Sequence, residues 1–237
     1  MRNYFIFGGR SSLDFDIRVE KCPRFSAAQR IVERQTVPGR SGDLLIDTGT
    51  YSNINQAYEI WFRNPQRPTV QAAREIALWL LSGQGYIRLE DSYDPDIFRQ
   101  ALFAGPLDVE NWMLTHGRAQ LEFDCKPQRF FKSGQFPLQI VSGQYLVNPG
   151  MPALPLIQIT GTGDGQLVVG GSTVDITDMA GGITLDCEIQ DAYNGTLNLN
   201  NNITVTGGWP VLEMGQTAVA FSGGITAVEI TPRWWTL

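Results

Sequence analysis

The sequence has 237 residues, of which 43% are hydrophobic and 18% are charged, and its formal net charge is −6. This composition can bury a hydrophobic core and includes no apolar run near the ~20 residues of a membrane span, which excludes a wholly disordered chain and favours a soluble one. Three distant cysteines and a single histidine exclude a disulfide framework and leave little scope for metal or acid–base chemistry.

Charge divides the chain into two parts. Residues 1–132 hold 17 of the 18 Lys and Arg and 16 of the 24 Asp and Glu, whereas the remainder has one cation, Arg233, and eight carboxylates. Such a change of composition is typical of a domain boundary, so we predict domains at 1–134 and 135–237. The acidic second part argues against binding of nucleic acid, whose phosphates it would repel.

The first predicted element is a strand near the N-terminus. Residues 1–9 contain too short an apolar stretch for a signal peptide, so we expect synthesis in the cytoplasm. Residues 13–20 alternate apolar and charged side chains, which predicts a half-buried strand. The side chains expected on its core face are Leu13, Phe15, Ile17 and Val19.

Further strands and one helix follow in the first domain. The spacing of Tyr58–Phe62 and of Ile87 and Leu89 predicts two strands. Residues 119–126 again alternate apolar and polar side chains, which predicts another strand. Cys125 is expected on its core face as a small core residue. Helical spacing predicts one helix over Thr69–Leu81, or about residues 69–82 up to the stop at Gly83.

The second domain is predicted to consist of short strands separated by glycine pairs. The strands are expected around Val174 and Ile176, Ile183 to Ile189, Val219 and Phe221, and Val228 and Ile230. Asn200–Asn202 is expected to form the turn of a hairpin between Leu197–Leu199 and Ile203–Val205. The breaks are expected at Gly170–Gly171, Gly181–Gly182, Gly207–Gly208 and Gly223–Gly224. Strands at roughly ten-residue spacing predict an antiparallel sandwich or jelly roll.

Motifs for catalysis are absent from the sequence. His116 is expected in a loop, without partners for acid–base work, and Gly161–Gly165 is expected to be a β-turn because it lacks dinucleotide-loop spacing. We therefore predict no enzyme, no catalytic residue, no cofactor and no metal site. One alternative stays open, since the acidic turn around Asp91, Asp94 and Asp96 has the oxygen ligands that calcium prefers. A solvated acidic turn is the favoured interpretation.

Tryptophans provide the basis for an alternative function. Trp209 lies in a predicted turn of the sandwich, where an exposed ring would offer a flat platform to a sugar. Trp234 and Trp235 are adjacent, so at least one of them is expected in the core. The alternative is a carbohydrate-binding β-sandwich protein that contacts the host cell surface.

Several short motifs, in this order, resemble the distal tail protein family of siphophages and related prophages. The matching segments are Phe7–Phe15, the Pro-Gly-Arg turn in Val37–Leu44 with Asp47–Tyr51 after it, Val147–Gly150 with Pro155–Gly163, and Ile230–Leu237. They extend over nearly the whole chain and lie on both sides of the boundary predicted from charge.

The resemblance implies a mainly β protein that is a structural component of the virion. An N-terminal β-rich domain with one helix would form a six-fold ring, followed by a galectin-like antiparallel β-sandwich. As a homo-oligomer of six copies, the ring would be a hub of the baseplate that joins the tail tube protein to tail-tip and receptor-binding proteins. DNA would pass through its lumen without specific binding.

The turn that carries the resemblance provides the candidate site residues. Its candidate fold-marker or inter-subunit positions are Pro38, Gly39, Arg40, Gly42 and Asp43. Near-balanced charge in the first domain suits contacts between copies, because both signs are available without net repulsion. Trp209 remains the candidate sugar or partner contact of the alternative function.

Overall fold

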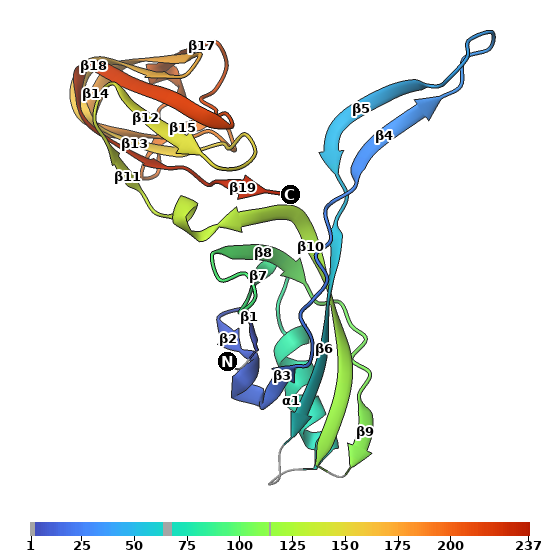
Figure 1. Cartoon of the computed structure of the whole chain (residues 1–237). Coiled ribbons are helices and arrows are strands. Elements are labelled where there is room, and N and C mark those ends of the chain that lie inside the picture. The colour runs from blue at the N-terminus through green and yellow to red at the C-terminus, as the bar shows by residue number, and fades with distance from the viewer. Residues whose placement is uncertain (1–2, 64–67, 114) are drawn as a thin grey trace. The chain divides into compact units, whose positions relative to one another are not determined.

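The computed structural model describes residues 3–63, 68–113 and 115–237 and shows a mainly β chain with one α-helix (Figure 1). It forms two compact units, one that extends to Arg129 and includes Leu237, and one of Phe130–Thr236. The mainly β fold class predicted from the sequence is confirmed. Each unit has its own hydrophobic core.

The first unit is built on an antiparallel sheet in which β2, β1, β7, β8, β10, β6 and β3 are neighbours in that order, and β9 pairs with β10. The strands are β1 (Phe5–Phe7), β2 (Arg10–Ser11), β3 (Ile17–Val19), β6 (Ile54–Arg63), β7 (Ile87–Asp91), β8 (Ile97–Leu102), β9 (Glu110–Met113) and β10 (His116–Phe131). Both alternating segments predicted at Tyr58–Phe62 and at 119–126 lie inside long strands of this sheet.

The helix α1 (Thr69–Leu81) forms where helical spacing predicted it. Its buried side chains include Ile76, Trp79 and Leu80, which belong to the core of the first unit. The Trp79 ring stacks on Phe5 with 5.7 Å between ring centroids, and its Nε1 donates a hydrogen bond to the carbonyl oxygen of Phe7. The helix is thus fixed to the sheet through one indole ring that contributes both packing and a hydrogen bond.

Cys125 lies in this core, as the alternation of residues 119–126 predicted. Its side chain is fully buried on β10, and burial raises the pKa of the thiol to about 12. Cys187 in the second unit is likewise buried, and burial also raises its pKa to about 12. Both thiols are therefore packing residues, because the reactive thiolate is disfavoured at neutral pH.

The strand predicted at residues 13–20 is wrong over its first half. Ser12–Phe15 form a 3₁₀ helix (η1), and only Ile17–Val19 pair in the sheet as β3. The reason is a local capping box, in which Ser11 Oγ accepts from the Leu13 amide and Asp14 accepts from the Ser11 amide. Ile17 and Val19 remain buried, as the alternation predicted.

The second unit is an eight-stranded antiparallel sheet whose three long strands bend to form two layers. Its strands are β11 (Leu138–Ile140), β12 (Gln144–Asn148), β13 (Leu156–Val169), β14 (Ser172–Asp186), β15 (Asp191–Asn194), β16 (Leu197–Asn198), β17 (Ile203–Thr206) and β18 (Gly215–Thr231). The last strand, β19 (Trp235–Thr236), does not belong to this sheet and pairs with β10. One half of each long strand pairs near β11 and β15, and the other half pairs near β12 and β17. A single core cluster takes side chains from both halves.

Two of the predicted glycine breaks are bends inside strands, not turns between strands. Gly181–Gly182 lies within β14, and Gly223–Gly224 lies within β18, so the two strands predicted at Val219 and Val228 are one. At the bend the backbones approach so closely that a Cβ on Gly161 would lie 2.2 Å from the Gly224 carbonyl oxygen. Gly161–Gly165, expected as a β-turn, is accordingly an irregular stretch of β13 against its neighbours.

The hairpin predicted around Asn200–Asn202 is also wrong in its pairing. These residues form a 3₁₀ turn (η3), but the strands on either side pair with different partners, β16 with β15 and β17 with β14. The strand predicted to reach Ile189 ends at Asp186, and the Ile189 side chain is exposed. Gly170–Gly171 and Gly207–Gly208 lie in turns, as predicted.

An ion pair near the C-terminus connects charge to stability in the second unit. Arg233 donates from Nη1 to Asp186 Oδ1 at 2.7 Å and from Nη2 to Oδ2 at 3.0 Å. These hydrogen bonds lower the pKa of Asp186 below its ordinary value, although partial burial opposes them. The folded protein therefore holds the Asp186 proton more weakly than the unfolded chain does, which stabilises the fold above about pH 4.

We expect this contribution to be lost as the pH falls through the lowered pKa of Asp186. In Arg233→Gln, the pKa of Asp186 should return toward its ordinary value, so this variant should lose less stability than the original protein between pH 5 and pH 2. Urea unfolding at a series of pH values, followed by tryptophan fluorescence, measures the difference. Parallel pH dependences in the two proteins would contradict the assigned role of the ion pair.

Candidate functional site

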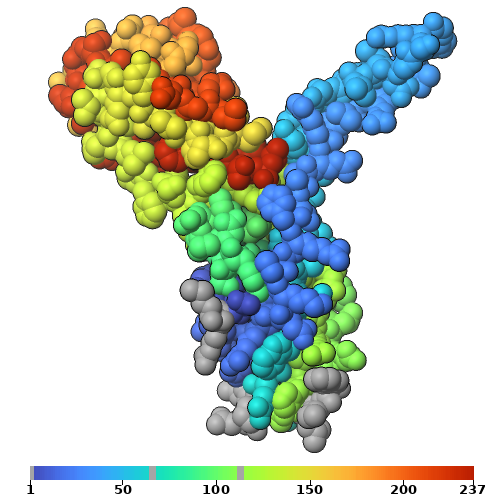
Figure 2. All heavy atoms as spheres, viewed as in Figure 1, coloured from blue at the N-terminus to red at the C-terminus, as the bar shows by residue number. Residues whose placement is uncertain are grey.

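An almost wholly exposed two-stranded ribbon, which we call the arm, belongs to the first unit. It consists of β4 (Arg30–Gln35) and β5 (Leu44–Tyr51), which pair with each other as a separate two-stranded sheet. Every β4 residue is exposed, as is every β5 residue except the half-buried Tyr51. Figure 2 shows the arm as a narrow projection from the rest of the first unit. A two-stranded ribbon of this kind is marginally stable by itself in water, because it has no core.

Apolar side chains project from both faces of the arm. The exposed ones are Ile31, Val32, Leu44, Leu45 and Ile46, and Leu45 is the most exposed of them, at 61%. In the strand register, Leu45 lies opposite Arg34 and Ile46 lies opposite Glu33. Since neighbouring residues of a strand point to opposite faces, neither face is purely polar. Such an apolar surface on a thin ribbon is typical of a binding site for protein.

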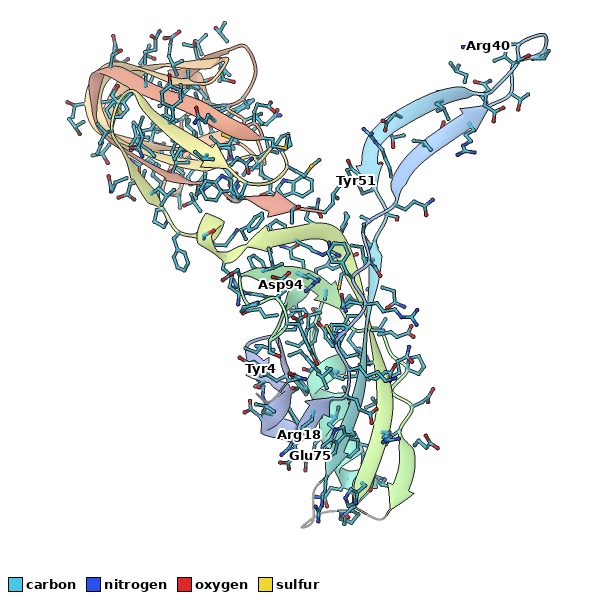
Figure 3. All side chains as sticks on the ribbon, viewed as in Figure 1. Tyr4, Arg18, Arg40, Tyr51, Glu75 and Asp94 are labelled. Carbon is cyan, nitrogen blue, oxygen red and sulfur yellow. The ribbon has the colours of Figure 1, made fainter. Side chains whose placement is uncertain are left out.

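The structure brings the candidate turn residues together at the tip of the arm. Figure 3 shows Arg40 at the turn between β4 and β5, and Tyr51 at the opposite end of the arm. Gly39 and Gly42 have positive φ angles of 82° and 86°, which other residues rarely adopt. The Arg40 amide donates to the Val37 carbonyl at 3.2 Å. The two glycines and this bond close the turn.

The remaining candidates at the tip have different surroundings. Asp43 Oδ1 accepts a hydrogen bond from Thr36 Oγ1 at 3.0 Å across the base of the turn. Pro38 precedes Gly39, where its fixed φ favours the start of a turn. The Arg40 side chain is exposed. The turn residues thus determine the geometry of the tip, and Arg40 presents a positive charge there.

Charges on the arm are of both signs. Arg30 forms an ion pair of 2.8 Å with Asp47 across the two strands, and Glu33 and Arg34 are exposed beside it on β4. An exposed pair of this kind contributes little to stability, because water screens it. The mixture of charges nevertheless allows the arm to bind a surface that also carries both signs.

Trp209, the candidate of the alternative function, packs against the core of the second unit. Its side chain is half-buried, and its carbonyl oxygen accepts from Ser172 Oγ at 3.4 Å. It lines a cavity of about 270 Å³ together with Glu213, Gln216 and Thr217. Because part of the ring is committed to the core, Trp209 has a structural role whether or not a ligand occupies the cavity. Trp234 and Trp235 are both half-buried against the same core.

Asp91 was expected in a solvated acidic turn, and this interpretation is wrong. Its carboxylate is buried and accepts hydrogen bonds from Tyr58 Oη at 2.8 Å and from the Tyr93 and Asp94 amides at 3.0 Å. Arg99 Nη1 lies 3.4 Å from the same carboxylate. Asp91 is therefore the centre of a buried polar network that connects β6, β7 and β8, whereas Asp96 is exposed.

Burial of Tyr58 raises the pKa of its phenol well above the ordinary value, and Asp91 raises it further. Tyr58 thus stays protonated and donates to Asp91. Among the described residues, no cluster of three or more His, Cys, Asp or Glu side chains has an arrangement that could hold a metal ion. His116 was expected in a loop, but it begins β10 opposite Arg63, with Nδ1 3.0 Å from Thr115 Oγ1.

Sequence reasoning found the tip of the arm but missed its apolar sides. The short apolar runs Ile31–Val32 and Leu44–Ile46 on either side of a Pro-Gly turn are a hairpin signal that could have revealed them. No signal in the sequence shows that this hairpin lacks a covering layer. In the part of the chain that the structure describes, no helix has the length and hydropathy needed to cross a membrane.

Comparison with known proteins shows similarity at the level of structure. No protein family model and no curated protein sequence matches the chain. Its structure is similar to that of the Dit protein of phage SPP1, described as a paradigm of the hub adsorption apparatus in phages that infect Gram-positive bacteria, with a TM-score of 0.76, 13% identity and 100% coverage of both chains. It is also similar to a chain of the phage P2 baseplate in its activated conformation with Ca, with a TM-score of 0.50, 10% identity and 97% coverage of both chains. The resemblance to distal tail proteins is confirmed at the level of the fold.

Proposed function

We propose that this chain, which has the fold of a phage hub protein, is a structural component of the phage tail tip. In this proposal it is a distal tail protein of a siphophage or prophage, and six copies form a ring that joins the tail tube protein to tail-tip and receptor-binding proteins. The chain transforms no substrate, and DNA passes through the lumen of the ring without specific binding. Similarity to the SPP1 hub protein over the whole chain supports this function.

The observation that carries the proposal is the exposed arm. A hairpin with apolar side chains on both faces and no covering layer is stabilised when a partner buries those side chains. In a ring, each subunit presents one surface to the next subunit and receives a different surface from the previous one. The arm is suited to be one of these two surfaces.

The charges of the two domains support different positions in the assembly. Residues 1–132 have nearly equal numbers of cations and anions, so six copies could approach one another without strong repulsion. The second domain, proposed here as a galectin-like sandwich, is strongly acidic. Its net charge favours a place outside the ring contacts, where it remains solvated or binds a partner.

The carbohydrate-binding alternative has less support. It requires an exposed aromatic platform, and Trp209 is instead half-buried against the core of its own unit. A glycan array tests this alternative directly. We expect that the original protein binds no glycan through Trp209. If the original protein binds a glycan strongly and Trp209→Ala does not, the alternative is favoured.

Light scattering coupled to size-exclusion chromatography tests the proposed ring. We expect a species of six times the 26.3 kDa chain mass, which negative-stain microscopy should show as a ring with a central channel. A protein that remains monomeric over a wide range of concentrations would overturn the proposal. If the ring forms, light scattering at two salt concentrations shows how much of the association is electrostatic, since salt screens exposed charges.

A further inference from the structure

The helix α1 has an apolar stripe on the face opposite its buried side. Val70, Leu78 and Leu81 are 53%, 72% and 51% exposed, although each is an aliphatic residue. Residues 70, 74, 78 and 81 lie on one face at helical spacing, so these side chains form one continuous stripe around Arg74. None of the described residues of the first unit covers this stripe, because the core lies on the other face of the helix.

A groove lies beside the stripe. It has a volume of about 480 Å³, and Glu75 and Leu78 of α1 line it together with Ser82, which follows the helix, and with Arg10 and Ile87. Figure 3 labels Glu75 on α1. The lining of the groove therefore combines apolar side chains with charges of both signs. This composition is typical of a surface that binds protein more than of a small-molecule pocket.

From these two surfaces we infer that the α1 stripe and its groove receive the arm of a neighbouring copy of the chain. The inference rests on the proposed ring and assigns its second contact surface. Within the described part of the first unit, the arm and the α1 stripe are two different apolar surfaces without a covering layer. A ring needs such a pair, because its contacts join unlike surfaces of successive subunits.

The dimensions of the two surfaces agree. The six residues of β4 extend over about 20 Å at the rise of a strand. The thirteen residues of α1 also extend over about 20 Å at the rise of a helix. The arm can therefore lie along the whole stripe, and its apolar residues can contact the stripe at several positions.

The charges of the two surfaces are compatible as well. Glu33 and Arg34 are exposed on the arm, while Arg74 and Glu75 lie next to each other on α1. Each surface thus offers one carboxylate and one guanidinium. In one orientation of the arm on α1, Glu33 faces Arg74 and Arg34 faces Glu75. Complementary charge of this kind specifies the direction of docking more than its strength.

Disulfide cross-linking tests the inference in the full-length chain. Cys22 is the exposed cysteine, so Cys22→Ser provides the background, and Cys125 and Cys187 remain because they are buried. Tagged Leu45→Cys is mixed with untagged Leu78→Cys, and the mixture is assembled and oxidised. Each chain then has one exposed cysteine, so a heterodimer can only form between copies. We expect this heterodimer as the main product.

A matched control uses an exposed aliphatic residue of the second unit. Val141 is 73% exposed, and Leu45→Cys mixed with Val141→Cys should give little cross-linked heterodimer. In a chain that carries both Leu45→Cys and Leu78→Cys, oxidation should give a ladder of covalent oligomers that ends at the hexamer.

The outcomes separate failure of the inference from failure of the proposed function. Rings without the Leu45–Leu78 heterodimer would overturn the inference and leave the proposed function standing. Cross-linking only between two copies of Leu45→Cys, or only within one chain of the double variant, would do the same. A protein that stays monomeric in light scattering would overturn both.

Discussion

Replacing Leu45 and Ile46 of the arm with aspartate is expected to leave the protein folded but to prevent its assembly. Burial of one large aliphatic side chain contributes about 1.5–3 kcal/mol, so losing two should weaken each contact between subunits by roughly 100-fold to 10,000-fold. Both side chains are exposed within the chain, so the stability of the monomer should change by no more than about 0.5 kcal/mol. Light scattering should show the monomer, and the circular dichroism spectrum should be that of the original protein, because the fold of each chain is retained. The midpoint of thermal unfolding should fall by the stabilisation that assembly provides.

A matched control variant tests whether the loss of assembly is specific to the arm. Val141 and Val147 of the second unit are 73% and 57% exposed, and replacing both with aspartate introduces the same number of charges. We expect this variant to assemble like the original protein. An arm variant that still assembles, or a control that loses assembly to the same degree, would contradict the assigned role of the arm.

Asp91→Ala is expected to have the largest effect on the stability of the first unit. The substitution leaves Arg99, whose side chain is 9% exposed, without its buried carboxylate, and it removes the acceptor of the Tyr58 hydroxyl. Breaking a buried ion pair from one side costs about 3–5 kcal/mol, since the other charge remains buried without compensation. Urea unfolding followed by fluorescence, with the shift of the midpoint converted to free energy, measures this loss.

Two further variants divide the effect of Asp91 into its parts. Tyr58→Phe removes one hydrogen bond and should cost about 1 kcal/mol. Asp96→Ala changes an exposed carboxylate of the same turn and should cost no more than about 0.5 kcal/mol. If Asp91→Ala were as stable as Asp96→Ala, the buried network would not stabilise the fold as described.

Periodicity in the sequence was sufficient to predict the elements whose structure depends on local neighbours. The helix at Thr69–Leu81 and the strands around Tyr58–Phe62 and Leu121–Cys125 follow from the spacing of their apolar residues, and the structure confirms them. Residues 13–16 show the limit of this reasoning. Their alternation is that of a strand, but hydrogen bonds of Ser11 and Asp14 with nearby amides favour a 3₁₀ turn.

Glycine pairs were ambiguous for a different reason. At Gly170–Gly171 the pair forms a turn, whereas at Gly223–Gly224 it lies inside a strand that bends. The difference depends on which backbone lies opposite, since a Cβ on Gly224 would lie 1.8 Å from the Thr162 carbonyl oxygen. That neighbour is distant in sequence, so no local pattern distinguishes a turn from a bend.

The sequence alone determined the class of the fold, the place of its helix, part of its core and the turn at the tip of the arm, because each depends on the order of apolar, polar and turn-forming residues along the chain. Only the tertiary structure decided which side chains are buried by segments distant in the sequence and which stay exposed. It buried Asp91 in a network from three strands, and it left Leu45 and Leu78 exposed although both are aliphatic. Burial is a property of the packed elements, and packing joins segments that the sequence keeps apart.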